Sequence, residues 1–419
     1  MNSFGSSKTT VLIKGIVKMK IFYFGSVCSN EKFNETVAGS RVKPSASAQN
    51  FETALIKGFS ADSNVELTVA SAESIAMYPG GNRLYLKKRK DALTERVSAN
   101  IIPAFNLPWL KQTGHANGAA RLLKKWLKEN RDESDKRVLV YGIYPKVVKK
   151  LQKVCRKRGC GIYAVITDVP STMFTYTKSK NLLKRLFSGS YRQLAIDLQD
   201  KFDGYVYLTE AMKDEVAPDK PYIVMETIAD TTIFDGVENV KKAEPPALMY
   251  AGALYKKYGV DLIVDTFERV TMDCELWLFG SGDYEQEIVE RAKNNPKIKF
   301  FGRVSREEVL LREKQATLLL NIRNSEDDYT KYSFPSKMIE YMLSGTPLVT
   351  TKLSGIPEEY YEYCYAVSDR ASDKIAARID DILADKDLEQ MGERARIFVL
   401  ENKNAVCQTK KITEFLEQN

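Results

Sequence analysis

A serine, a lysine and a glutamate stand close together in SFPSKMIEYMLSGTP, residues 333–347. Ser336 is the expected N-cap of a short helix that Gly345 ends. The N–H groups of a first helical turn attract anions, and Lys337 adds a positive charge at the same end. Glu340, one turn further on, can accept hydrogen bonds from two hydroxyl groups. The segment therefore predicts a site for a ligand that carries phosphate and hydroxyl groups.

The helical spacing also predicts how this helix is oriented. The residues expected to face the core are Met338, Ile339, Met342 and Leu343. The opposite, ligand-facing side is expected to carry Lys337, Glu340, Tyr341 and Ser344. The alternative is an ordinary surface helix, in which Lys337 and Glu340 form an i,i+3 ion pair worth roughly 0.2–0.5 kcal/mol.

Further glycine- or cation-bearing loops follow the expected strands in the second half of the chain. Each loop alone is more typical of a tight strand-to-helix turn than of a binding site. Together they would lie at one edge of a parallel sheet, where such sheets bind ligands, and would suit an anionic, nucleotide-like molecule. The candidate contacts in these loops are Gly252, Lys256, Lys257, Gly280, Gly282, Arg303 and Arg323.

The first half offers fewer candidates for chemistry. Asp168 follows an expected strand and can face a substrate, although a turn or N-cap aspartate before Val169 and Pro170 is the alternative. His115 is the only histidine and lies in QTGHANG, 112–118, which we interpret as a polar surface loop. With one histidine and six scattered cysteines, neither a zinc site nor Cys–His catalysis is expected, and a reduced cytosolic protein is the default.

Strand and helix signals alternate along the chain, which predicts an α/β layer architecture. In the first half we expect helices at 48–61 and 145–158, a long loop after the first strand, and strands at 20–27, 65–71, 137–143, 162–170, 205–210 and 222–227. In the second half we expect helices at 260–270, 285–295 and 305–316, the last with a capping box from Ser305 to Glu308. The strands expected there are 247–253, 275–283, 298–304 and 317–323.

A polar, proline-ended segment at 236–246 is the best candidate for a linker. We therefore predict an N-terminal extension at 1–17, a first doubly wound domain at 18–240 and a second at 241–400. A helix at 401–419 is expected to pack back toward the first domain. Two such domains would place an active site in the cleft between them.

Charge is distributed unevenly over the 419 residues. Residues 1–240 carry 37 Lys and Arg against 24 Asp and Glu, a net charge of +13, whereas residues 241–419 have a net charge of −5. The basic clusters are 86–90, 121–128, 146–159 and 181–187. They are either solvated helix faces or a surface for anionic lipid. No nucleic-acid-binding motif accompanies them, so nucleic acid is not an expected partner. No run of about 18 apolar residues predicts a membrane span.

The segment SFPSKMIEYMLSGTPLVTTKLSGIPEE, 333–359, resembles the donor-site segment of GT-B glycosyltransferases of the family 4 (group 1) type. Its form is familiar from bacterial capsule, O-antigen and exopolysaccharide transferases. The resemblance covers 247–360 through YAGALYKKYGVDLIVDTF, LWLFGSGD, FFGRVSREEV and LLLNIR; the first half shares only its alternation and ITDVP, LTEAMKDE and IADTTIF. It implies two Rossmann-like domains facing a central cleft, with 18–240 on the acceptor side and 241–400 binding a nucleotide sugar.

The resemblance also implies roles for individual residues. Glu340 would bind the donor ribose, and Ser336 with Lys337 would bind the diphosphate. The backbone at Arg303 and Val304 would hold the base, while the glycines at 280 and 282 would let the donor approach. Members of this family use no metal or cofactor, because cations and helix N–H groups stabilise the leaving diphosphate. Most retain the anomeric configuration, and the catalytic residues expected here are Asp168 and Lys337.

Two positions depart from the family pattern. Tyr332 stands where an acid usually lies, eight residues before Glu340, while Ala253 and Tyr258 replace the Arg and Lys of the loop after the first strand of the second domain. The residues that can supply the missing charge are Lys256, Lys257, Arg323 and Lys337.

The expected function is sugar transfer from a nucleotide sugar, with a UDP-sugar as the expected donor. The acceptor would be a hydroxyl of a growing glycan or of a polyprenyl-diphosphate-linked sugar. The expected location is the cytoplasm, with the basic first domain resting on the inner, anionic face of the membrane. One alternative is a nucleotide-sugar epimerase or hydrolase on the same fold. The other is a non-catalytic, glycosyltransferase-like partner subunit, which Tyr332 and Ala253 would favour.

Overall fold

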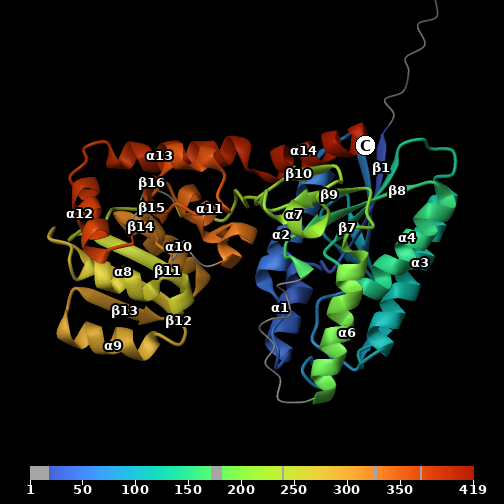
Figure 1. Ribbon diagram of the computed structural model, residues 1–419, viewed down its shortest axis with the longest axis horizontal. Coiled ribbons are helices and arrows are strands. Elements are labelled where there is room, and N and C mark those ends of the chain that lie inside the picture. The colour runs from blue at the N-terminus through green and yellow to red at the C-terminus, as the bar shows by residue number, and fades with distance from the viewer. Residues whose placement is uncertain (1–17, 171–181, 238–239, 324–327, 369) are drawn as a thin grey trace, which may run out of the picture.

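The structure is a computed structural model that describes residues 18–170, 182–237, 240–323, 328–368 and 370–419, without the side chains of 182–188, 328 and 329. The predicted extension at 1–17 and the side chains of the basic cluster at 181–187 lie outside the described residues. Two sheets, each with helices on both faces, lie side by side (Figure 1). The predicted α/β fold with two Rossmann-like domains is confirmed.

The first sheet has eight strands, and all neighbours run parallel except the edge pair β5 and β4. Its central strands are runs of apolar residues buried on both faces, as expected for a parallel sheet covered by helices. The order across the sheet is β10 (Tyr222–Val224), β9 (Gly204–Tyr207), β8 (Gly161–Ile166), β7 (Lys136–Tyr141), β1 (Met19–Gly25), β2 (Val65–Ser71), β5 (Ser98–Ile101) and β4 (Arg89–Ala92).

Helices cover this sheet on both faces and bury two separate apolar clusters. One face carries α3 (Leu110–Glu129), α4 (Pro145–Arg158), α6 (Leu182–Gln199) and α7 (Met212–Val216). The other carries α1 (Asn30–Gly39), α2 (Ala46–Ala61) and the last helix of the chain, α14 (Ala405–Gln418). Ile412, Phe415 and Leu416 of α14 are buried in that second cluster. The C-terminal helix therefore completes the core of the first domain.

The second sheet has six parallel strands. Their order is β13 (Ile298–Gly302), β12 (Glu275–Ser281), β11 (Ala247–Ala253), β14 (Leu318–Asn321), β15 (Leu348–Thr351) and β16 (Tyr365–Val367). One face is covered by α8 (Val260–Phe267), α9 (Glu285–Asn294) and α12 (Ser372–Leu383), and the other by α10 (Arg306–Gln315), α11 (Ser336–Leu343) and α13 (Leu388–Asn402). Short 3-10 turns lie at 256–258, 328–332 and 358–363.

Two expectations about local structure are wrong. The segment after the first strand is not a long loop, because α1 begins there behind the N-cap Ser29, whose hydroxyl accepts a hydrogen bond from the N–H of Lys32. The segment 112–118 is not a surface loop but the first turns of α3. Its Gly118 allows close packing, since a Cβ there would lie 2.2 Å from Cγ2 of Ile102. His115 is consequently buried, and desolvation lowers its pKa to about 4.

A buried ion pair joins the two domains where the chain returns from α13 to α14. Nζ of Lys403 lies 2.6 Å from Oε1 of Glu226 and 2.6 Å from Oε1 of Glu359. The side chains of Lys403 and Glu226 are 1% and 3% exposed. The hydroxyl of Tyr360 donates to the same oxygen of Glu226. Glu226, at the end of the first domain, therefore contributes to the domain junction.

Candidate active site

A cavity of about 670 Å³ lies between the two domains. The first domain contributes Ser47, at the start of α2, and the loop after β8 with Asp168 and Val169. The second domain contributes Tyr250, Ala253, Lys257, Tyr258, Arg323 and the segment 332–337. Parallel sheets bind ligands beyond the carboxyl ends of their strands, and the cavity lies at that edge of both sheets.

The start of α11 forms part of the cavity wall, but not with the cap predicted from the sequence. Pro335 is the N-cap, its carbonyl accepts from the N–H of Met338 at 2.8 Å, and α11 begins at Ser336. Pro335 takes this position because its backbone is extended, so the predicted N-cap was displaced by one residue. Among the residues that the structure describes, no side chain caps the helix start. The wall therefore has the positive end of a helix dipole beside Lys337.

Lys337 crosses the end of the central strand of the second sheet. A Cβ added at Gly252 would lie 2.8 Å from Cε of Lys337, so the glycine makes room for this side chain. Arg323 stands at the end of the neighbouring strand, where Nε donates to Oδ1 of Asn321 at 3.1 Å. Its guanidinium lies 5.5 Å from the ring centre of Tyr258. With Lys257, three predicted cations line the same cavity.

Asp168 faces these cations from the first domain. Its side chain is exposed at the cavity, and Oδ2 accepts from the hydroxyl of Thr167 at 3.3 Å. Partial desolvation by the surrounding protein raises the pKa of Asp168. A carboxylate therefore stands opposite a cationic wall.

Glu340 lies one turn beyond Lys337 and pairs with a different residue from the one expected. Its Oε2 lies 3.0 Å from Nη2 of Arg306, at the start of α10, rather than pairing with Lys337. Glu340 does not line the cavity itself. The predicted face was wrong for Tyr341 and Ser344, which are buried. The hydroxyl of Tyr341 accepts from the N–H of Ala251 at 2.9 Å, which draws that side chain into the core.

A second acid, not identified from the sequence, lies behind Glu340. Glu313 of α10 is fully buried, and no hydrogen-bond donor among the described residues reaches either of its carboxyl oxygens. Burial and the negative charge of Glu340 raise the pKa of Glu313 well above its usual value. The surroundings of Glu313 therefore disfavour its charged form. The one sequence signal was Leu310, three residues earlier, which marks the inward face of α10.

The other predicted residues lie around the cavity rather than in its wall. A Cβ at Gly280 would lie 1.7 Å from the carbonyl oxygen of Gly252, and one at Gly282 would lie 2.2 Å from that of Leu254. These glycines therefore allow close backbone packing, and their contact with a donor stays a prediction. Lys256 lies over the ring of Tyr284 at 5.2 Å.

The loop after β13 carries the pair predicted to hold the base. Nε of Arg303 donates to the hydroxyl of Ser281 at 2.5 Å, and Val304 is partly buried against the core of the second domain. Neither residue lines the cavity. The structure therefore brings Asp168, Lys257, Arg323, Ser336 and Lys337 together and leaves the remaining candidates beside them.

Tyr332 connects the two domains at the cavity. Its hydroxyl donates to Oε1 of Glu215 at 2.9 Å, and the hydroxyl of Thr209 donates to the carbonyl of Lys331 at 2.7 Å. Glu215 and Thr209 belong to the first domain. The residue at the family's acidic position therefore takes part in contact between the domains.

Glu52 of α2 supports the loop that follows β1. Its carboxyl accepts from the backbone N–H of Ser26 at 2.9 Å, from the hydroxyl of Ser26 at 2.5 Å and from that of Tyr23 at 2.9 Å. Complete burial raises the pKa of Glu52 from its ordinary value of 4.5 to about 7. The same helix carries Ser47 into the cavity wall.

This raised pKa predicts a pH dependence of stability. Because the folded protein keeps the proton to higher pH than the unfolded chain, the free energy of unfolding should fall as pH rises from about 5 to 8. Glu52→Gln cannot titrate, so we expect its free energy of unfolding to fall by about 2–3 kcal/mol less over this pH range than that of the wild type. Urea unfolding across this pH range measures it, with the exposed Glu35→Gln as control. Equal slopes for the wild type and Glu52→Gln would contradict the assignment.

In the part of the chain that the structure describes, no helix is long and apolar enough to cross a membrane. Within the same residues, no group of three or more His, Cys, Asp and Glu side chains is arranged to hold a metal ion.

Residues 245–385 match the model of the family described as glycosyl transferases group 1. N-acetyl-alpha-D-glucosaminyl L-malate synthase of Bacillus anthracis is 29% identical over 164 residues, which cover 37% of this chain and 40% of that protein. The chain therefore aligns with less than half the length of this curated relative.

Several solved structures resemble this chain in fold over nearly its whole length. HepE of Anabaena, in complex with UDP, has a TM-score of 0.58 at 13% identity, covering 96% of this chain and 100% of that one. Sucrose-phosphate synthase of Thermosynechococcus elongatus has a TM-score of 0.59 at 11% identity, covering 96% and 99%. At these identities the likeness concerns the fold. The chain has the two-domain GT-B fold, and residues 245–385 of its second domain, about a third of the chain, resemble the glycosyl transferases group 1 family.

Proposed function

We propose that this protein is a glycosyltransferase that moves a sugar from a nucleotide-sugar donor to a hydroxyl of an acceptor. The observation that carries the proposal is the cavity between the domains. Lys257, Arg323, Lys337 and the start of α11 form its cationic side, and Asp168 faces them from the other domain. The family match of the second domain supports a nucleotide-sugar donor.

The donor diphosphate would lie at the start of α11, where the helix dipole, Lys337 and Arg323 meet. Glu340 would accept the ribose hydroxyls, with Arg306 and Glu313 fixing the orientation of its carboxylate. The base would lie against the backbone at Arg303 and Val304. UDP is the nucleotide we propose, because HepE, with the same fold, has been solved with UDP and with UDP-glucose.

In the reaction, the bond between the anomeric carbon and the diphosphate oxygen breaks, and the acceptor oxygen forms the new bond to that carbon. The departing diphosphate gains negative charge, which Lys337, Arg323 and the N–H groups of α11 would stabilise. The acceptor hydroxyl would give its proton to the leaving phosphate oxygen, so no protein nucleophile is required and configuration is retained. Asp168 would accept a hydrogen bond from a sugar or acceptor hydroxyl. No metal takes part in this scheme.

We further propose that the acceptor is a growing glycan or a polyprenyl-diphosphate-linked sugar in polysaccharide biosynthesis, used at the inner face of the membrane. The resemblance to capsule and exopolysaccharide transferases and the net charge of +13 in residues 1–240 support this acceptor class.

A thermal-shift screen against nucleotides and nucleotide sugars, followed by product analysis, tests the proposal. We expect stabilisation by UDP and a UDP-sugar, and sugar transfer only when an acceptor is present. Sugar epimerisation or release without an acceptor would instead identify an epimerase or hydrolase. Nucleotide binding without turnover across a broad acceptor panel would identify a non-catalytic subunit.

Glu340→Ala tests the donor site directly. Because a carboxylate that accepts hydroxyl hydrogen bonds contributes roughly 1.5–3 kcal/mol, we expect UDP affinity to fall about 10- to 100-fold by titration calorimetry. Glu313→Gln keeps a hydrogen-bond donor toward Glu340 and should retain most of the affinity. Glu290→Ala, at an exposed ion pair of α9, is the control. Unchanged affinity in Glu340→Ala would refute the ribose role.

A further inference from the structure

Large hydrophobic side chains are exposed together at one end of the first domain. Eight large hydrophobic side chains are exposed in the described part of residues 18–240, each between 46% and 58%. They are Val42, Met77, Tyr78, Leu84, Tyr85, Phe105, Trp109 and Leu110, which we call the apolar tip. Exposed apolar residues that gather in one place mark an interaction surface, whereas isolated ones do not.

Backbone contacts show that the apolar tip is one continuous surface. The short strands β3 (Tyr85–Leu86) and β6 (Ala104–Phe105) pair antiparallel, and the rings of Tyr85 and Phe105 lie 5.0 Å apart. The N–H of Tyr78 donates to the carbonyl of Asn106 at 3.0 Å, and that of Val42 to Gly80 at 3.0 Å. Residues far apart in the sequence are therefore held side by side.

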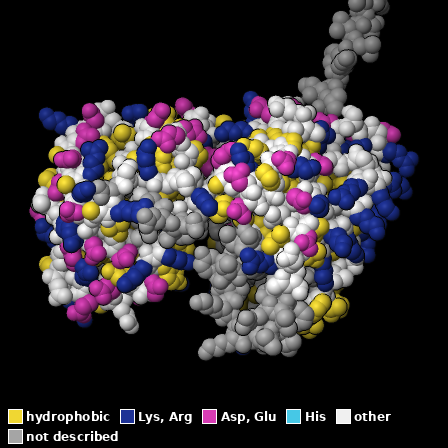
Figure 2. Space-filling view, in the orientation of Figure 1, with side chains coloured by type: hydrophobic (Ala, Val, Ile, Leu, Met, Phe, Trp, Pro, Cys, Tyr) yellow, Lys and Arg dark blue, Asp and Glu magenta, His cyan; other side chains and the backbone are white. Residues whose placement is uncertain are grey.

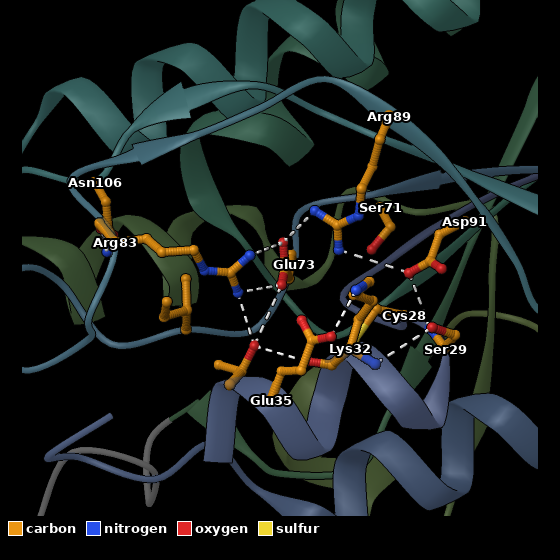
Figure 3. A network of polar contacts seen from close by, with 12 residues as sticks. Cys28, Ser29, Lys32, Glu35, Ser71, Glu73, Arg83, Arg89, Asp91 and Asn106 are labelled. Carbon is orange, nitrogen blue, oxygen red and sulfur yellow. Dashed lines mark hydrogen bonds and ion pairs between the residues drawn. The ribbon is translucent and has the colours of Figure 1, made fainter. Parts of the chain in front are cut away.

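The base of the apolar tip is fastened to the domain by buried charges (Figure 3). The carboxylate of Glu73, which is fully buried, pairs with Arg83 and lies 2.9 Å from Nη1 of Arg89. Nδ2 of Asn106 donates to the carbonyls of Ala76 and Arg83 at 2.9 and 2.8 Å. This network connects the segments that carry the apolar side chains to the body of the first domain.

Positive charge surrounds the apolar tip. Exposed lysines at 43, 87, 88 and 90 flank it in sequence, and no Asp or Glu occurs in residues 74–90 or 96–128. Lys146, at the start of α4, has Nζ 5.4 Å from the ring centre of Trp109. Figure 2 shows dark-blue side chains over α3 and α4 and yellow ones at the lower end of this domain. The surface is therefore apolar with a basic rim.

The contact between Trp109 and Lys146 shows where the apolar tip lies with respect to the cavity. Lys146 follows the carboxyl end of β7, and β7 pairs with β8, whose carboxyl end leads to Asp168 in the cavity wall. The apolar tip and the cavity therefore lie at the same edge of the first sheet. A molecule presented at the apolar tip would approach the acceptor side of the cavity.

We propose that the apolar tip inserts into the headgroup region of an anionic phospholipid bilayer and that the lysines around it contact the lipid phosphates. This inference rests on the proposed function and names the surface from which a lipid-linked acceptor would enter. Aromatic rings prefer the interface between headgroups and acyl chains, and lysines extend toward the headgroups. A protein interface would instead be depleted of lysine.

Vesicle flotation tests the proposal. We expect the wild type to float with vesicles of phosphatidylcholine and phosphatidylglycerol, and at least tenfold less with phosphatidylcholine alone. Tyr85→Ser/Phe105→Ser should lower binding to the anionic vesicles at least tenfold. Met272→Ser/Val406→Ser removes two exposed hydrophobic side chains elsewhere and should bind as the wild type does. Equal binding by the two double variants would overturn the proposal.

Fluorescence gives a second readout that does not depend on catalysis. Of the three tryptophans, Trp126 and Trp277 are buried and Trp109 is 58% exposed. Anionic vesicles should therefore shift the emission of the wild type to shorter wavelength, and Trp109→Phe should abolish the shift. A UDP-induced thermal shift in the same variants reports the donor site separately. No vesicle binding by the wild type, or self-association that Tyr85→Ser/Phe105→Ser abolishes, would exclude a bilayer as the partner.

Discussion

Lys337→Met should lower kcat about 100- to 1000-fold, the usual effect of removing one group that stabilises developing negative charge. Lys337 lines the cavity at the uncapped start of α11, and its side chain passes over Gly252. In the proposed reaction it meets the departing diphosphate, so its charge matters most in the transition state. Steady-state kinetics with a UDP-sugar and an acceptor measure this, and KM for the donor should change much less than kcat.

Two matched variants test whether the loss of kcat is due to the positive charge at position 337. Lys337→Arg keeps the positive charge and should recover part of kcat, although a guanidinium does not match the geometry of an ammonium group. Lys293→Met removes an exposed lysine of α9 that pairs with Glu290 and does not line the cavity. This variant should leave kcat unchanged. If Lys337→Met kept the wild-type kcat, the diphosphate would have to lie elsewhere in the cavity.

Lys403→Met should lower the free energy of unfolding by about 3–5 kcal/mol, because it leaves the buried carboxylate of Glu226 without its cation. Lys403 is 1% exposed and lies between Glu226 and Glu359. Its backbone carbonyl also accepts from the N–H of Ala229 at 2.8 Å. Chemical denaturation followed by circular dichroism measures the loss.

The double variant Glu226→Gln/Lys403→Met shows whether the stability is lost through an unpaired buried charge or through lost packing contacts. It removes both charges, so most of the lost stability should return. Lys410→Met breaks an exposed pair with Glu414 on α14 and should cost less than about 0.5 kcal/mol. If the double variant were as unstable as Lys403→Met, the loss would come from packing against Tyr360 and Phe398, whose ring centres lie 4.9 and 5.3 Å from Nζ.

The two residues that replace the usual Arg and Lys of the resembled family lie in the wall of the cavity. Ala253 and Tyr258 both line it, so the charge of the usual Arg and Lys is absent from those two positions. Lys257, Arg323 and Lys337 line the same space. Arg323 lies against the ring of Tyr258, which gives the aromatic residue a role in holding a cation. We therefore expect the donor phosphates to depend on these three cations.

The sequence by itself determined the fold class and much of the element order. The expected strands at 65–71 and 247–253 coincide with β2 and β11, and the helix at 285–295 differs from α9 by one residue. These elements were predictable because hydrophobic periodicity and capping residues act over a few neighbouring positions. Ser305, for example, accepts from the N–H of Glu308 at 3.1 Å, as the local pattern predicted.

Only the tertiary structure decided which residues meet. Glu340 pairs with Arg306 rather than Lys337, and Glu313 lies behind it, because α10 and α11 pack side by side although 34 residues separate Arg306 from Glu340. His115 is buried because Gly118 lets α3 approach Ile102, whereas in sequence the same glycines are typical of a loop. The apolar tip likewise combines three separate segments. Pairings of this kind depend on how distant elements pack, and no local pattern encodes that.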